Sequence, residues 1–178
     1  LPFMQSFVSG ELVEDYLRTE TSKFFGQLYS AATGNAGASS SSVTAEKIID
    51  YIAALEENDY SANGIVVTNP VWAKFLKTKP QDYSLPGGNA ITVTGTGDVM
   101  VAGVPVLRTK ASNIGNNMML IGDWTKASII QTEGLSVNMY EQDSDNVQRN
   151  LITVKAEARV ALAVLRTDAF IYASAGTT

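Results

Sequence analysis

The stretch VQRNLITVKAEARVALAVLRTDAFIYA, residues 147–173, lies in the longest part of the chain without glycine or proline. Thr153 and Lys155 alternate there with Val154, and period-two alternation is typical of a strand with one buried face. Residues 158–165 carry a single charge, which predicts a strand covered on both faces. We predict one long strand, or two in line with a bend, that crosses the molecule and pairs with earlier segments.

Residues 3–32 have the pattern of a long helix. Apolar residues recur at about fourfold spacing, at Met4, Val8, Leu12, Tyr16, Phe24 and Leu28. An unbroken helix of this length would be about 45 Å long. A helix longer than a small domain is wide needs an extended partner, and the 147–173 stretch is the obvious one.

The middle of the chain predicts a small unit of helices and strands. Helices are expected over 44–58 and from Asn69–Pro70 to Pro80, the second with Val71, Trp72, Phe75 and Leu76 facing inward. Strands are expected at 65–68, 91–94, 99–101, 103–107, 118–121, 127–131 and 135–140. Pro105 predicts an edge strand or a bulge. Residues 33–42, 79–89, 113–117 and 141–146 are predicted as loops or turns.

Composition excludes several classes of site. The chain has no Cys and no His, so disulfides, His-based triads and His metal sites are excluded. The net charge of −5 argues against a nucleic-acid-binding face. No apolar run approaches the roughly 20 residues that span a bilayer. Gly95–Gly97 lacks the remaining residues of a dinucleotide or phosphate loop, so a hairpin turn is predicted there.

An ordered set of motifs closes the chain. An acidic turn leads to Asn150, an aliphatic strand follows at 151–154, an Ala-rich strand with an acid and Arg two apart at 156–163, and an Ala-aromatic strand at 166–171. This set resembles the C-terminal signature of tailed-bacteriophage major capsid proteins with the Hong Kong 97-type fold.

Earlier segments extend the resemblance over nearly the whole chain. Gly64–Pro70 before Trp72, Gly103–Val106 and Gly122–Trp124 resemble motifs of the same family, and the helix from Met4 resembles its spine helix. The resemblance implies an α+β fold with a peripheral domain, 1–42 and 132–161, and a mixed α/β axial domain, 43–131 and 162–178. The family's N-terminal arm and E-loop have no counterpart, and the chain starts without Met. We therefore expect a piece of a longer protein that assembles weakly alone.

The resemblance also implies a function, that of a structural head protein of a bacteriophage or prophage. Such a protein self-assembles into an icosahedral shell in the bacterial cytoplasm and encloses DNA without sequence-specific binding. The implied partners are further copies in pentamers and hexamers, a scaffolding protein and a portal protein. No cofactor, no metal and no membrane are expected. An encapsulin-type compartment shell with an enzyme cargo, and a small-molecule-binding α/β domain, remain as alternatives.

Two groups of residues are candidates for contacts between subunits. The polar loop 79–89 is expected at the ring axis, with Lys79, Gln81, Asp82 and Tyr83 as contacts. The acidic turn and the strand after it supply Glu141, Asp143, Asp145, Arg149 and Arg159. The three acids have the spacing of a calcium loop, but Asn146 and Ile152 stand where Gly and Glu are required. We therefore predict an acidic turn that pairs with a neighbour's basic residues.

Asn150 and Glu157 form a second candidate pair. Seven residues apart on a regular strand, they would project to opposite faces. In family members that crosslink themselves, an Asn and a Glu at matching positions act with a neighbour's Lys. The resemblance thus implies Asn150 as isopeptide acceptor and Glu157 as proton acceptor. The plainer interpretation is that Glu157 pairs with Lys155 or Arg159 of another strand or subunit.

Overall fold

The computed structural model describes residues 2–32, 45–77, 84–85, 88–94, 97–115, 117–142, 146–149 and 151–174. Its helices are α1 (Pro2–Ala32), α2 (Ala45–Glu56), α3 (Asn69–Lys77), α4 (Ala111–Ile114) and α5 (Asn146–Arg149), with 3-10 turns η3 (Trp124–Lys126) and η4 (Thr167–Ala169). Its strands are β1 (Gly64–Thr68), β2 (Ser84–Leu85), β3 (Gly88–Asn89), β4 (Ile91–Val93), β5 (Val99–Val101), β6 (Val104–Thr109), β7 (Met118–Gly122), β8 (Ala127–Tyr140), β9 (Thr153–Val164) and β10 (Phe170–Ser174).

A six-stranded mixed sheet with the order β10-β7-β1-β6-β5-β4 forms the body of the molecule. Strands β1 and β6 are parallel, and the other neighbours in this sheet are antiparallel. The predicted hairpin is confirmed, since Ile91 pairs with Val101 and Val93 with Val99. The apolar run GIVVT of β1 is buried along its whole length, as expected for a strand between two layers.

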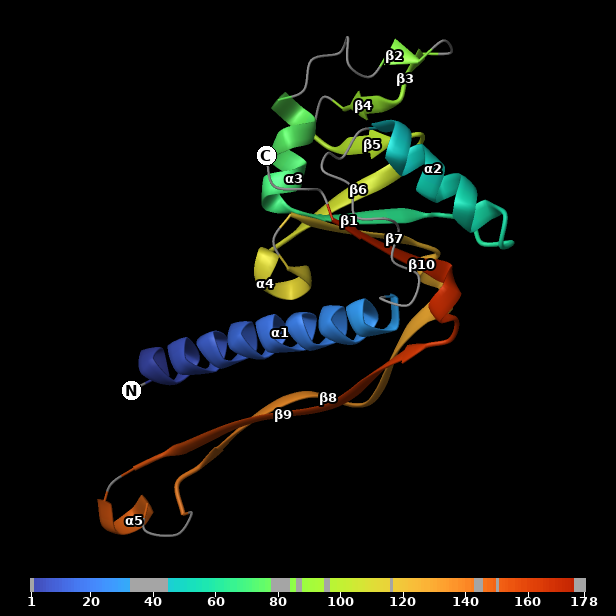
Figure 1. The fold of residues 1–178 in the computed structure, drawn as a ribbon. Coiled ribbons are helices and arrows are strands. Elements are labelled where there is room, and N and C mark those ends of the chain that lie inside the picture. Colours follow the sequence, from blue (N-terminus) through green and yellow to red (C-terminus); the bar gives the residue numbers. More distant parts are fainter. Residues whose placement is uncertain are drawn as a thin grey trace.

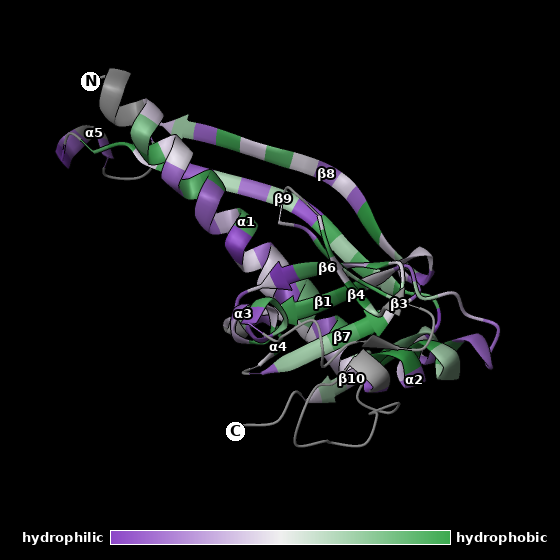
Figure 2. Ribbon diagram, turned by 90° about the horizontal axis from the view of Figure 1, so that it is seen from above, coloured by the Kyte–Doolittle hydropathy of each residue, from purple (hydrophilic) through white to green (hydrophobic). Residues whose placement is uncertain are grey.

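The two faces of this sheet carry different helices. One face packs Ile65 and Val67 against α2 and α3, while the opposite face packs Val66 against α1 and α4. Alternation along β1 therefore separates two cores. In Figure 1 the layers follow one another as α2 and α3, the sheet, then α1 and α4, and the strands of the body are mostly hydrophobic in Figure 2.

Helix α1 confirms the predicted long helix. Its C-terminal part is anchored, because Leu28 and Ala32 are buried in the core on that face of the sheet. Its N-terminal part reaches past the body, and Phe7 and Leu17 are half exposed. The predicted extended partner is present, since α1 contacts β9.

Strands β8 and β9 form a separate two-stranded antiparallel ribbon. Figure 1 shows it leaving the body, running along the side of α1 opposite α4, and ending at α5. Its pairing runs from Ala127 opposite Val164 to Tyr140 opposite Thr153, with register shifts between 131 and 136. The predicted strands 127–131 and 135–140 are therefore one bulged strand.

Several sequence-based predictions were wrong in detail. The 147–173 stretch contains two strands in different sheets, because η4 redirects the chain from the ribbon into the six-stranded sheet. The 158–165 segment is not covered on both faces, since every second residue of β9 up to Ala161 is exposed and Leu165 is 63% exposed. Leu76 faces outward rather than into the core.

Pro105 also departs from prediction, because β6 is an interior strand of the sheet. The proline pairs with Met100 of β5, whereas the parallel register with β1 begins one residue later, at Val106. Its missing N–H therefore falls before the β1 ladder starts. The predicted turn at 113–117 overlaps the end of α4 at Ile114, and Asn117 adopts a positive φ of 52°.

Candidate assembly surfaces

The β8–β9 ribbon exposes large apolar side chains toward both of its ends. Ile129 and Ile130 are 60% and 54% exposed, and Met139 and Tyr140 are exposed near the far end. Both strands also have one edge with no partner strand among the described residues. A two-stranded ribbon is marginally stable in water without further packing. These exposed groups therefore form a surface suited to contact with other protein.

The outer face of β9 carries a row of charges at two-residue spacing. Lys155, Glu157 and Arg159 are all exposed. The Lys155 ammonium lies 2.6 Å from the Glu157 carboxylate, and the Arg159 Nε lies 3.2 Å from the carboxylate of Glu133 on β8. Within this chain Glu157 therefore pairs with a residue of its own strand, and its pairing with another subunit stays a prediction.

Of the remaining candidate residues, two are described by the structure. Glu141 is exposed just after β8, and Arg149 is exposed at the end of α5. Lys79, Gln81, Asp82, Tyr83, Asp143, Asp145 and Asn150 lie outside the described residues. The regular strand begins at Thr153 and includes Glu157, so the predicted relation between Asn150 and Glu157 stays a prediction.

A hydrogen-bonded junction joins the body to the ribbon, and sequence reasoning missed it. The Asp123 carboxylate caps η3 by accepting from the Thr125 N–H at 3.0 Å and the Thr125 hydroxyl at 2.6 Å. The Asn63 amide donates to the same carboxylate at 3.2 Å, and the Trp124 Nε1–H donates to the Gly64 carbonyl at 2.9 Å. The signal in the sequence was the Gly122–Trp124 motif, which predicted only a turn.

The electrostatics of this junction favour the charged carboxylate. The Thr125 hydroxyl hydrogen bond lowers the pKa of Asp123, burial acts in the opposite direction, and the Thr125 N–H and the Lys126 ammonium lower it further. The Lys126 Nζ lies 4.0 Å from the carboxylate. A fixed negative charge at this point holds the start of the ribbon against the body.

A second buried polar contact attaches the C-terminal strand. The Tyr172 hydroxyl donates to the Ile114 carbonyl at 3.0 Å, and the Tyr172 ring lies edge-on to Tyr29 with centroids 4.2 Å apart. Burial raises the pKa of Tyr172, and the Tyr29 hydroxyl raises it further. The contact joins β10, α4 and α1 in one core.

Sites for other chemistry are not evident in the described part of the chain. Its acidic residues form no group of three or more that could hold a metal ion. None of its helices is both long and apolar enough to cross a lipid bilayer. What the described residues do present is the exposed surface of the β8–β9 ribbon.

Comparisons with known proteins agree with this geometry. The family model described as the phage capsid family matches residues 2–175. The major capsid protein of Enterobacteria phage HK97 is 31% identical over 130 residues, which is 71% of this chain and 32% of that protein. The chain thus spans about a third of the length of the curated relative it matches.

Solved structures show the same fold at low identity. A structure from Microbacterium phage Oxtober96 has a TM-score of 0.63 and 14% identity, covering 83% of this chain and 54% of that one. The holo-SrpI encapsulin complex from Synechococcus elongatus gives 0.53 and 17%, covering 80% and 53%. The α+β Hong Kong 97-like fold predicted from the sequence is confirmed, and the chain belongs to the phage capsid family.

Proposed function

We propose that this chain forms part of a self-assembling protein shell, the head of a bacteriophage or prophage that encloses a genome. The observation that carries the proposal is the β8–β9 ribbon, which extends from the body with exposed apolar side chains and open strand edges. Contacts with neighbouring copies would cover those groups. Membership of the phage capsid family supports the same function.

Under this proposal the chain divides into a peripheral and an axial domain. The peripheral domain would comprise residues 1–42 and 132–161, and the axial domain 43–131 and 162–178. Copies would form pentamers and hexamers around the axial domain, and head-to-tail interfaces of this kind close into rings. A scaffolding protein, a portal protein and enclosed DNA are proposed partners, with assembly in the host cytoplasm.

The ring-axis contact is proposed for the polar loop 79–89, with Lys79, Gln81, Asp82 and Tyr83. Deleting this loop is expected to abolish ring formation while the folded body is kept. Circular dichroism would check the fold, and electron microscopy the rings. Unchanged rings after the deletion would contradict this part of the proposal.

A crosslinking step is proposed for the strand after the acidic turn. A neighbour's Lys Nζ would attack the side-chain carbonyl carbon of Asn150, form an isopeptide bond and release ammonia, with Glu157 accepting the ammonium proton. Glu157 is already paired with Lys155 and half exposed, so a neighbour must cover it before it can act. Mass spectrometry of assembled shells should find a Lys–Asn isopeptide that is lost in Glu157→Gln and kept in the control Glu133→Gln. Its absence from the unsubstituted shell would exclude the step.

An encapsulin-type compartment is the second candidate, favoured by the similarity to an encapsulin structure. Negative-stain electron microscopy with light scattering on the full-length protein tests both candidates. Closed shells of uniform size are expected, and their contents decide between nucleic acid and a protein cargo. A compact monomer at all concentrations would contradict both and favour the small-molecule-binding domain.

A further inference from the structure

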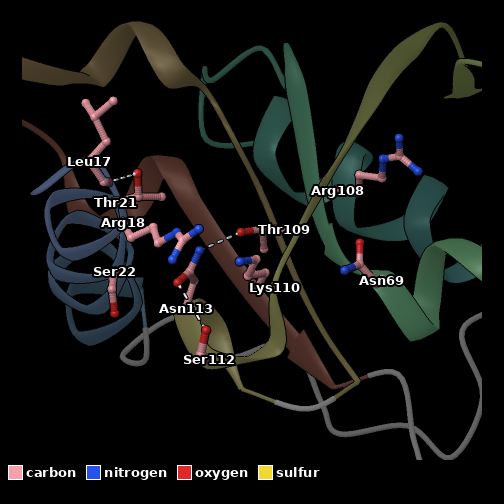
Figure 3. Close-up of a pocket in the computed structure, with 10 residues that line it drawn as sticks. All are labelled: Leu17, Arg18, Thr21, Ser22, Asn69, Arg108, Thr109, Lys110, Ser112 and Asn113. Atoms are coloured by element: carbon pink, nitrogen blue, oxygen red, sulfur yellow. Dashed lines mark hydrogen bonds between the residues drawn. The ribbon is translucent and has the colours of Figure 1, made fainter. Parts of the chain in front are cut away.

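A basic groove lies between α1 and the segment that joins β6 to α4. Its volume is about 560 Å³, and its walls include Leu17 and Arg18 from α1, Arg108 from the end of β6, Lys110 from the link and Asn113 from α4. Figure 3 shows Arg18, Lys110 and Asn113 close together, with Arg108 set apart from them and its guanidinium directed away. The groove opens where the parallel strands β1 and β6 both end, which is where ligands commonly bind in open sheets.

Among the described residues, the cations of this groove differ in how far carboxylates balance them. Arg18 pairs with Glu14 at 3.2 Å and with Asp15 at 3.5 Å. The Arg108 guanidinium instead lies 4.7 Å from the centre of the Trp72 ring. Among the described residues no carboxylate lies within ion-pair distance of Arg108 or Lys110. Arg108 and Lys110 are two cations at one groove of a chain with net charge −5. Their charge is complementary to an anionic ligand.

The acid-rich end of the ribbon is the best match in charge. Glu141 is exposed and has no ion pair with another described residue, and two further aspartates follow it in the sequence EQDSD, residues 141–145. The ribbon runs on the side of α1 opposite α4, so this end cannot enter the groove of its own molecule (Figure 1). It can reach only the groove of another copy.

The groove and the Glu141 end of the ribbon also both expose apolar side chains. Leu17 is 50% exposed on the groove wall, while Met139 and Tyr140 are 38% and 43% exposed next to Glu141. Apolar contacts around a charge pair lower the local dielectric and so increase the attraction between the charges, while removing the charges from water costs free energy. The two surfaces are different patches of the same chain, so the contact is head-to-tail and can propagate around a shell.

We propose that the groove between α1 and α4 binds the Glu141 end of the β8–β9 ribbon of a second copy, through Arg108 and Lys110. This inference rests on the proposed assembly of the chain into a shell and names one of its contacts.

Charge reversal tests the contact in the full-length protein. Glu141→Lys and Lys110→Glu should each weaken self-association about tenfold or more, measured by sedimentation velocity at low salt, because each places like charges together. The double variant should recover most of the loss. Glu57→Lys makes the same charge change at an exposed position outside both surfaces and serves as the matched control.

A disulfide test does not depend on closed shells. The chain has no Cys, so Glu141→Cys and Ser112→Cys variants mixed and oxidised with diamide can form only intermolecular bonds. A mixed disulfide between the two variants is expected in large excess over the control mixture of Glu57→Cys with Ser112→Cys. Equal yields from both mixtures would overturn the proposal.

Other outcomes separate this inference from the proposed function. If Glu141→Lys and Lys110→Glu form the same shells as the unsubstituted protein, the groove contact is wrong and the shell function stands. If the unsubstituted protein forms no shell, the proposed function is wrong, and the disulfide yields decide the groove contact. If Lys110→Glu abolishes binding of a 20-nucleotide single-stranded DNA while Glu141→Lys leaves self-association unchanged, the groove binds nucleic acid and the proposal is overturned.

Discussion

Gly122, the last residue of β7, leaves no room for a side chain. A Cβ built there would lie 2.3 Å from Phe170 Cδ1 and 2.7 Å from the Ala169 carbonyl oxygen. Phe170 is fully buried and lies edge-on to Trp124 with centroids 5.6 Å apart, so its ring cannot swing away. Gly122→Ala therefore forces β7 and β10 apart at the point where the body meets the ribbon.

The size of the effect follows from these distances. Ordinary contacts are about 3.4–4 Å, so the ring must move by about 1 Å and the carbonyl by about 0.7 Å. That carbonyl accepts the Asp123 N–H at 2.9 Å, so its movement also weakens a backbone hydrogen bond. Overpacking of this kind costs about 1–3 kcal/mol, and the backbone involvement places Gly122→Ala toward the upper end of that range.

Urea denaturation followed by circular dichroism would measure this change. Gly10 is the matched control, because a Cβ there meets nothing within 4 Å and the position is inside α1. Gly10→Ala should raise the free energy of unfolding by up to about 1 kcal/mol, since alanine favours a helix over glycine. If Gly122→Ala changes the free energy of unfolding by less than about 0.5 kcal/mol, the close packing of β7 against β10 is wrong.

Three further substitutions test polar contacts. Tyr172→Phe should lower the free energy of unfolding by about 1 kcal/mol through loss of a buried hydrogen bond, checked by urea titration. The pKa of Tyr172 is raised in the folded protein, so its contribution to the free energy of unfolding is present below pH about 10 and is lost above it. The Tyr172→Phe variant should lose less stability over that range than the unsubstituted protein. The hydrogen bond from Thr125 lowers the pKa of Asp123. The contribution of Asp123 to the free energy of unfolding is therefore present above pH about 3.9 and is lost as the pH falls below it. In Asp123→Asn the free energy of unfolding should depend less on pH in this acidic range. Glu133→Ala, which breaks the exposed pair with Arg159, should change the free energy of unfolding by less than about 1 kcal/mol, and a larger loss would show that the ribbon depends on this pair.

Periodicity predicted the elements that have strong local patterns. The fourfold apolar spacing from Met4 to Leu28 gave the long helix, and GIVVT gave a strand buried along its length. The residues of the 91–101 hairpin were also correct, because a Gly-containing turn between two β-branched runs sets the pairing locally. The family motifs predicted the overall fold, because they occur along the chain in the same order as the helices and strands of that fold.

Features that depend on distant segments were missed. The Pro105 prediction failed because edge or interior position depends on whether β1 lies beside β6, and the two are separated by about forty residues. Arg108 near the end of β6 and Lys110 just after it carry no local signal, and they line a groove only because α1 packs beside α4. The pairing of Glu157 with Lys155 depends on rotamers that sequence alone does not specify.

The sequence by itself determined the long N-terminal helix, the strands of the body, the family and the absence of Cys and His chemistry. These follow from residue identity and from periods of two and about four, which are local properties. Tertiary structure decided that the 147–173 stretch divides between a ribbon and a sheet, which face of β9 is open, and where unpaired charges gather. Those outcomes depend on which segments compete for the same core, because burying Phe170 and Tyr172 against α1 turns the chain out of the ribbon and into the sheet.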